Sequence, residues 1–270
     1  MNTQQGSRYC PLSLNRNQLK YLVIAAMLLD HIAWAFVPLD SILGQTMHFI
    51  GRLTGPTMAY FVVEGYCHTR NVKKYAQRLG IFALLSWIPF VYFEYGCMPI
   101  AILKGNVTDS AGKLLFYMQR SDRTLAIVPQ FGVVYTLLLG LLAIWLWDRG
   151  NCPRWYKKLG IIGLCMLSFF GDWPVYDVLY CFFLFYYRED PESKWTAFGI
   201  TTLFCCAGTI FEKSIRTGFF TLGIFMVPVL LHFCYNGERG SGKPVHKWFF
   251  YWFYPVHLLI LGMLRWIILV

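Results

Sequence analysis

The stretch QLKYLVIAAMLLDHIAWAFV, residues 18–37, is the first long apolar run of the chain, and it decides what kind of fold to expect. About 20 predominantly apolar residues are what an α-helix needs to cross the hydrocarbon core of a bilayer. Asp30 and His31 stand side by side in its second half. Ionisable side chains are costly in lipid, so their presence indicates a functional role. The run therefore predicts a membrane helix with a polar site.

The rest of the chain has the same character. Its 270 residues are 57% hydrophobic and only 14% charged, with a mean hydropathy of +0.46, whereas soluble domains carry about a quarter charged residues. We expect nine membrane-spanning segments, at residues 18–37, 44–66, 75–95, 130–147, 158–171, 173–187, 195–211, 217–235 and 248–269. This pattern predicts an all-α, polytopic transmembrane helical bundle of about nine to ten membrane helices, with residues 1–270 forming one integral-membrane domain.

The net charge of +10 first suggests a nucleic-acid partner, but the distribution of the basic residues favours a bilayer instead. With the N-terminus in the cytoplasm, sixteen Lys and Arg fall on the cytoplasmic side: Arg8, Arg16, Lys20, Arg70, Lys73, Lys74, Arg78, Arg149, Arg154, Lys157, Lys158, Arg188, Lys194, Arg239, Lys243 and Lys247. Six fall outside: Lys104, Lys113, Arg120, Arg123, Lys213 and Arg216. This asymmetry predicts a multi-pass cell-membrane protein with its N-terminus in the cytoplasm. In a bacterium, the membrane expected is the inner membrane.

Two breaks in hydrophobicity punctuate the pattern. Residues 96–128 are predicted to form an outer loop with a short interfacial helix at Lys113–Gln119. The short segments 158–171 and 173–187 are predicted to be joined by a tight turn at Gly171–Pro174, with Asp172 as a turn or capping residue. The nine cysteines include no CxxC pair, so we expect no metal site.

Further polar residues lie inside the predicted spans. His31 is some 13 residues from the cytoplasmic end, about 20 Å deep, which is past the midplane. Arg52 lies in the second span, where Gly51, Gly55 and Pro56 predict an interrupted helix that lines a cavity. His48, four residues before Arg52, shares its helix face, and its place near the end of the span predicts an interfacial position.

His257 in the last span is also expected near the midplane. At the inner end of the second span, a polar and basic cluster is predicted to face the cytoplasm and to hold phosphate groups. Its members are Glu64, His68, Arg70, Lys73 and Lys74.

Several blocks together resemble the TraX family of membrane proteins. They are LDHIAWAF at residues 29–36, IGRLTGPTMAYFVVEGYCHTRN at 50–71, VVYTLLLGLLAIWL at 133–146, YNGERG at 235–240 and FFYWFYPVHLLIL at 249–261. The blocks cover the N-terminal third, the fourth span and the C-terminal sixth in the right order. Trp87 and the pair Trp173-Pro174 depart from the family pattern, and these departures bear on the acceptor more than on the acyl chemistry.

The resemblance implies an integral-membrane acetyltransferase that uses cytoplasmic acetyl-CoA to acetylate an acceptor, which is the pilin N-terminus in the best-known member or otherwise an envelope amine or hydroxyl. It implies catalytic roles for His31 as base or acyl carrier, Asp30 as its orienting group, Arg52 as an electrostatic clamp and His257 as a cavity residue. Two alternatives remain open: a proton-coupled transporter and a non-catalytic pilus or envelope assembly factor.

Overall fold

The computed structural model describes residues 13–104, 116–120 and 123–268. Contacts divide the chain into two compact units, each described here by itself. Unit 1 combines residues 1–58 with 195–250, and unit 2 combines residues 59–194 with 251–270. Both units therefore join segments that are far apart in the sequence.

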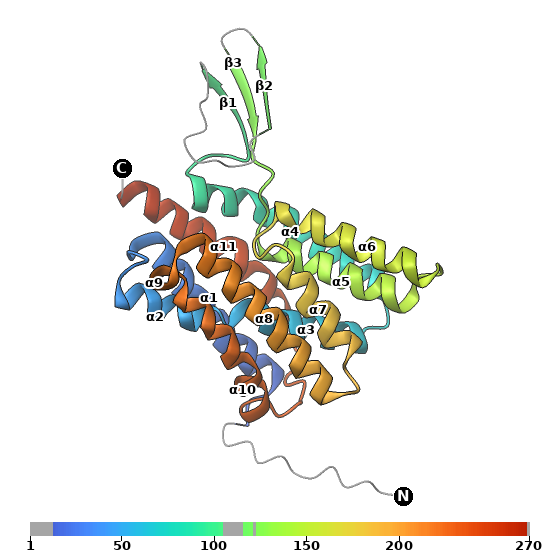
Figure 1. Ribbon diagram of the computed structural model, residues 1–270. Coiled ribbons are helices and arrows are strands. Elements are labelled where there is room, and N and C mark those ends of the chain that lie inside the picture. Colours follow the sequence, from blue (N-terminus) through green and yellow to red (C-terminus); the bar gives the residue numbers. More distant parts are fainter. Residues whose placement is uncertain (1–12, 105–115, 121–122, 269–270) are drawn as a thin grey trace, which may run out of the picture. The chain divides into compact units, whose positions relative to one another are not determined.

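The described residues are mainly helical (Figure 1). Unit 1 contains α1 (Arg16–Phe36), α2 (Ile42–Gly51), α9 (Ile215–Gly218), the 3-10 segment η2 (Phe219–Phe225), α10 (Met226–Phe233), most of α8 (Pro191–Lys213), and the first parts of α3 (Thr54–His68) and α11 (Pro244–Ile268). Unit 2 contains the remainders of α3, α8 and α11 together with α4 (Val72–Tyr95), α5 (Val133–Arg149), α6 (Arg154–Leu167), η1 (Ser168–Phe170), α7 (Tyr176–Tyr186) and the strands β1 (Ile100–Lys104), β2 (Phe116–Arg120) and β3 (Arg123–Ile127).

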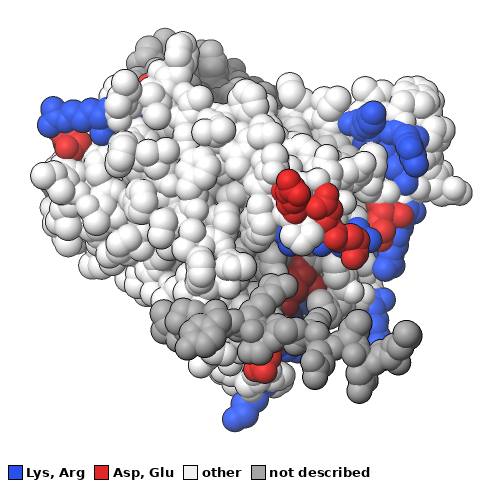
Figure 2. All heavy atoms as spheres, turned by 60° about the horizontal axis from the view of Figure 1, so that its bottom comes forward, with Lys and Arg blue, Asp and Glu red and all other residues white. Residues whose placement is uncertain are grey.

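Within the part of the chain that the structure describes, five helical runs are long and apolar enough to cross a membrane: residues 16–36, 72–95, 191–213, 215–233 and 244–268. Large apolar side chains on them are exposed, such as Leu84 at 63%, Phe204 at 68% and Ile260 at 52%. In the view of Figure 2, charged residues cover only a few places and most visible atoms belong to other residues. Surfaces of this kind are stable against lipid rather than water. The chain is therefore a multi-pass helical membrane protein.

The second predicted span is interrupted where the sequence indicates. Helix α2 ends at Gly51 and α3 begins at Thr54. Pro56 then falls in the first turn of α3, where a missing backbone donor costs no helical hydrogen bond. The predicted short pair also appears, as α6 and α7, with Trp173 and Val175 at positive φ between them and Asp172 Oδ1 accepting from Trp173 N at 3.1 Å.

Within unit 1, helix ends that the sequence assigns to the same side of the membrane meet each other. At the predicted inner ends, Leu14 N donates to Cys234 O at 2.8 Å and the Tyr21 hydroxyl lies 2.8 Å from His246 Nδ1. At the predicted outer ends, the Lys213 ammonium lies 5.4 Å from the centre of the Trp34 ring.

In unit 2 as well, helix ends that the sequence assigns to the same side of the membrane contact each other. At the predicted inner ends of α3 and α5, the Tyr66 hydroxyl donates to Asp148 Oδ2 at 2.5 Å. At the predicted outer ends, Trp87 Nε1 donates to Val128 O at 2.9 Å, and Arg265 Nη1 donates to Phe93 O at 3.1 Å.

The expectation for residues 96–128 is wrong in its secondary structure. Instead of a loop with a helix at Lys113–Gln119, the described part forms an antiparallel sheet in the order β1-β3-β2, which projects beyond α4 in Figure 1. Residues 116–119 belong to β2, whereas 113–115 lie outside the described residues. Strands form here because pairing between 100–104, 116–120 and 123–127 satisfies their backbone hydrogen-bond donors and acceptors. No local sequence pattern predicts this pairing.

Candidate functional site

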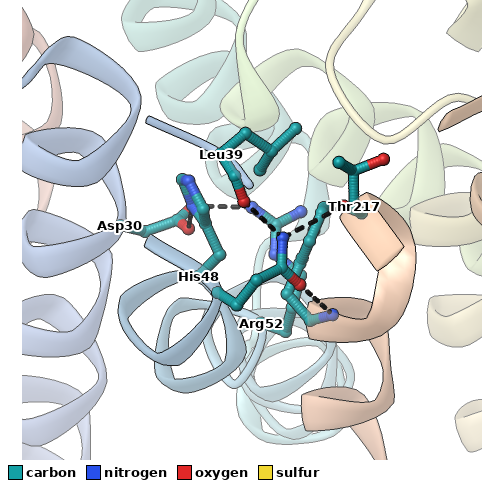
Figure 3. Close-up of polar contacts among 7 residues, drawn as sticks. Asp30, Leu39, His48, Arg52 and Thr217 are labelled. Carbon is teal, nitrogen blue, oxygen red and sulfur yellow. Dashed lines mark hydrogen bonds and ion pairs between the residues drawn. The ribbon is translucent and has the colours of Figure 1, made fainter. Parts of the chain in front are cut away.

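A buried carboxylate with two partners forms the polar centre of unit 1 (Figure 3). Asp30 Oδ1 accepts from His48 Nδ1 at 2.8 Å, and Asp30 Oδ2 accepts from Arg52 Nη2 at 2.6 Å. Asp30 and His48 are buried, and the Arg52 side chain is only 13% exposed. Three side chains thus meet at one carboxylate, and of these the sequence assigned Asp30 and Arg52 to a common site.

The break between α2 and α3 makes this meeting possible. A Cβ atom on Gly51 would overlap the side chain of Asp30, so only glycine lets α2 approach α1 this closely. The chain then reaches Arg52 at the C-cap of α2, where its guanidinium turns back to the same carboxylate. The three-residue cluster thus depends on a glycine that carries no functional group.

His48, which the sequence places near the end of its span, has a side chain that is 0% exposed. Because a carboxylate only accepts hydrogen bonds, His48 Nδ1 carries the hydrogen, and whenever the ring is neutral its lone pair lies on Nε2. Nε2 is buried and has no hydrogen-bond partner among the described residues.

Aromatic rings cover His48. The Trp34 ring centre lies 4.3 Å from the imidazole centre, and the Phe220 ring centre lies 5.3 Å from it. Phe220 also lies 5.1 Å from the Arg52 guanidinium. Trp34 is itself only half-buried, with the exposed Lys213 near its ring. Apolar rings therefore enclose the site, and Trp34 is the ring that reaches from it toward the surface.

Gln45, one turn before His48 on α2, fixes the backbone of Phe220 in this aromatic cover. Its Nε2 donates to Leu39 O at 2.7 Å and to Thr217 O at 3.2 Å (Figure 3), and its Oε1 accepts from Phe220 N at 3.1 Å. One side chain thereby joins α2 to the segment after α1 and to the start of η2. The sequence carries no signal for this role, because it depends on three backbone groups brought together by folding.

His31 is also buried, but its ring is held differently. It hydrogen bonds to the backbone of Met27, one turn earlier on α1. Side chains of consecutive helix residues point about 100° apart. The Asp30 side chain points to α2, and the His31 side chain therefore points in a different direction. The predicted roles of His31, Asp30 and Arg52 in catalysis remain predictions.

The remaining predicted residues belong to unit 2. His257 on α11 is buried, and its Nδ1 donates to Phe253 O at 2.7 Å while its ring stacks on Phe253 at 4.7 Å. Its role as a cavity residue also remains a prediction.

The predicted phosphate cluster gathers where α3 ends and α4 begins. His68, Arg70, Lys73 and Lys74 are exposed, and Glu64 is partly buried. His68 Nδ1 donates to Glu64 O at 2.8 Å, and Asn71 caps α4 by accepting from Lys74 N at 2.9 Å. Lysines in the first turn of a helix are unfavourable beside its positive end, so a bound anion would stabilise this arrangement. The residues present suit a phosphate-bearing ligand.

A multi-pass helical membrane protein with a buried Asp–His–Arg cluster is the class that fold and site define. The family model described as "TraX protein" matches residues 15–110 and 112–265. The chain belongs to the TraX family.

A curated relative extends the comparison. The chain is 32% identical over 250 residues to the "Probable fimbrial assembly protein FimC, serogroup H1" of Dichelobacter nodosus, covering 90% of this chain and 93% of that protein. No solved structure matches the chain.

Proposed function

We propose that this protein is an integral-membrane acetyltransferase that takes acetyl groups from cytoplasmic acetyl-CoA and transfers them to a pilin N-terminus or to an envelope amine or hydroxyl. The buried Asp30 carboxylate with a histidine and an arginine on its two oxygens carries the proposal. A histidine oriented by a carboxylate is suited to remove the proton of an attacking amine or hydroxyl. A guanidinium in a dry site is suited to stabilise negative charge that develops on a thioester oxygen.

The orientation that we propose has the N-terminus in the cytoplasm and about nine to ten membrane helices in a bacterial inner membrane. The charge asymmetry supports the direction, and the paired helix ends within each unit, such as Leu14 with Cys234 and Tyr66 with Asp148, support which ends share one side. In this orientation Arg70, Lys73 and Lys74 face the cytosol, where the phosphates of an acyl-CoA are available.

A thermal-shift experiment tests donor binding. A ligand that binds only the folded state at 100 times its Kd adds about 2.7 kcal/mol of apparent stability. We expect CoA to raise the unfolding temperature of the purified protein, and Lys73→Ala with Lys74→Ala to reduce that rise. Lys158→Ala is the control, because it is an exposed lysine near the start of a different helix, α6. Absence of any CoA-dependent shift in the wild-type protein would contradict the proposed donor.

Mass spectrometry of pilins and envelope polymers tests acetyl transfer in cells. Cells with the protein are expected to carry acceptors heavier by one acetyl group than cells without it. The name of the Dichelobacter nodosus relative favours a second candidate, a non-catalytic fimbrial assembly factor. That candidate predicts unchanged acceptor masses together with a defect in surface appendages.

A further inference from the structure

We infer that His48, rather than His31, provides the base of the proposed acetyl transfer, and that Trp34 is the side chain that covers it. This inference rests on the proposed function and assigns the reacting atom within it. Three observations in unit 1 carry it: the contact of His48 with Asp30, in contrast to the bonding of His31, the position of the His48 Nε2 atom, and the aromatic cover.

The first observation is the direct contact. Of the two buried histidines near Asp30, His48 makes the 2.8 Å hydrogen bond to the carboxylate, whereas the His31 ring bonds to the backbone of its own helix. A carboxylate that accepts from Nδ1 holds the ring in one tautomer and stabilises the imidazolium that forms when Nε2 takes a proton. Asp30 is therefore a positioning residue for His48.

The second observation is the unpartnered nitrogen. Nε2 of His48 is buried and has no hydrogen-bond partner among the residues that the structure describes. A buried polar atom without a partner is unfavourable for folding, so such atoms usually have a partner or a functional role. The acceptor's N–H or O–H group is the partner that the proposed reaction brings to this atom.

The third observation is the cover. Trp34 and Phe220 both pack on the His48 ring, and of these two Phe220 is buried at 2% exposure while Trp34 is half-buried. Gln45 ties the backbone of Phe220 to α2. Among the described residues, the Trp34 ring is held by contacts with the His48 and Phe220 rings and with the Lys213 ammonium, so a rotation of its side chain is the simplest way to open the site.

The chemical step balances without a further reactant. The acceptor nitrogen or oxygen attacks the thioester carbonyl while His48 Nε2 takes its proton. The carbon–sulfur bond then breaks, and the departing thiolate of CoA takes that proton back from Nε2. Arg52 lies on the other oxygen of Asp30, where its positive charge offsets the carboxylate.

Matched glutamine variants test the assignment, with radiolabelled acetyl-CoA as donor and envelopes of cells lacking the protein as the source of acceptor. We expect His48→Gln to lower acetyl transfer by about 10²–10⁴-fold, the usual contribution of a general base. The control His232→Gln changes an exposed histidine of α10 in the same unit and is expected to keep the wild-type rate, whereas added imidazole is expected to restore part of the activity of His48→Gly. A His48→Gln rate above about a tenth of wild type overturns the inference but leaves the proposed function standing. No transfer by the wild-type protein overturns the proposed function itself, and the assignment of a base falls with it.

A labelling experiment gives a second readout that needs no activity. Diethyl pyrocarbonate reacts with an unprotonated imidazole nitrogen, and mass spectrometry locates the product. We expect slow labelling of His48 in the wild-type protein and labelling at least tenfold faster in Trp34→Ala. Phe36→Ala, an exposed aromatic position on the same helix, is the control and is expected to leave the rate unchanged. Equal labelling in wild type and Trp34→Ala would contradict the role of Trp34 as the cover.

Discussion

Replacement of Asp30 by alanine tests the polar centre of unit 1 most directly. The change removes two hydrogen bonds between a charged acceptor and its donors, at 2.8 Å to His48 and 2.6 Å to Arg52. Hydrogen bonds to charged groups contribute about 1.5–3 kcal/mol each, and loss of one partner of a buried ion pair costs about 3–5 kcal/mol. We expect Asp30→Ala to lower the free energy of unfolding by about 3–5 kcal/mol.

A double-mutant cycle separates the ion pair from general damage. Arg52→Leu removes the cation and leaves Asp30 hydrogen-bonded to His48. The double variant lacks both members of the ion pair, so neither charge is left buried without the other. Neighbours that share a network show coupling of about 0.5–3 kcal/mol, and the short Asp30–Arg52 contact predicts the upper part of that range, about 2 kcal/mol.

The measurement is unfolding of the purified protein by titration with a denaturing detergent, followed by tryptophan fluorescence. Arg265→Leu serves as the control, because that guanidinium donates to the backbone carbonyl of Phe93 rather than to a carboxylate. The Asp30 and Arg265 changes are expected to add. If Asp30→Ala and Arg52→Leu are also additive within about 0.5 kcal/mol, the contact does not stabilise the protein and the reasoning fails.

Three further predictions concern close packing, the η2 tie and orientation. Gly51→Ala is expected to destabilise the protein by about 1–3 kcal/mol, because the added Cβ overlaps Asp30. The control Gly199→Ala is expected to be neutral or stabilising, because no neighbouring atom lies within 4 Å of the Cβ that it adds. Thermal unfolding of both variants checks this. Gln45→Ala is expected to cost about 1–3 kcal/mol in the same measurement, since three backbone groups lose a partner, and an unchanged unfolding temperature would contradict it. Cys67, kept as the single cysteine and exposed at the end of α3, is expected to react with a membrane-impermeant maleimide in inside-out vesicles; reaction in right-side-out vesicles instead would refute an N-terminus in the cytoplasm.

The membrane character of the fold was predictable because it depends on short-range properties. A helix that must satisfy its own backbone groups in lipid needs an unbroken apolar run, and such runs are visible residue by residue. The break at Gly51 was predictable for the same reason. The sheet at 100–127 was not, because strand pairing joins residues far apart in sequence and this segment lacks a clear alternation of polar and apolar residues.

For the site, the sequence by itself determined that Asp30, His31 and Arg52 lie in apolar segments and are therefore costly in lipid unless they serve a purpose. It did not determine the partner of Asp30. Neighbours on one helix point in different directions, so that partner depends on which second helix approaches and how closely. Only the tertiary structure decided that His48 fills this position, because the missing side chain of Gly51 lets α2 come against α1 and bring the imidazole to the carboxylate.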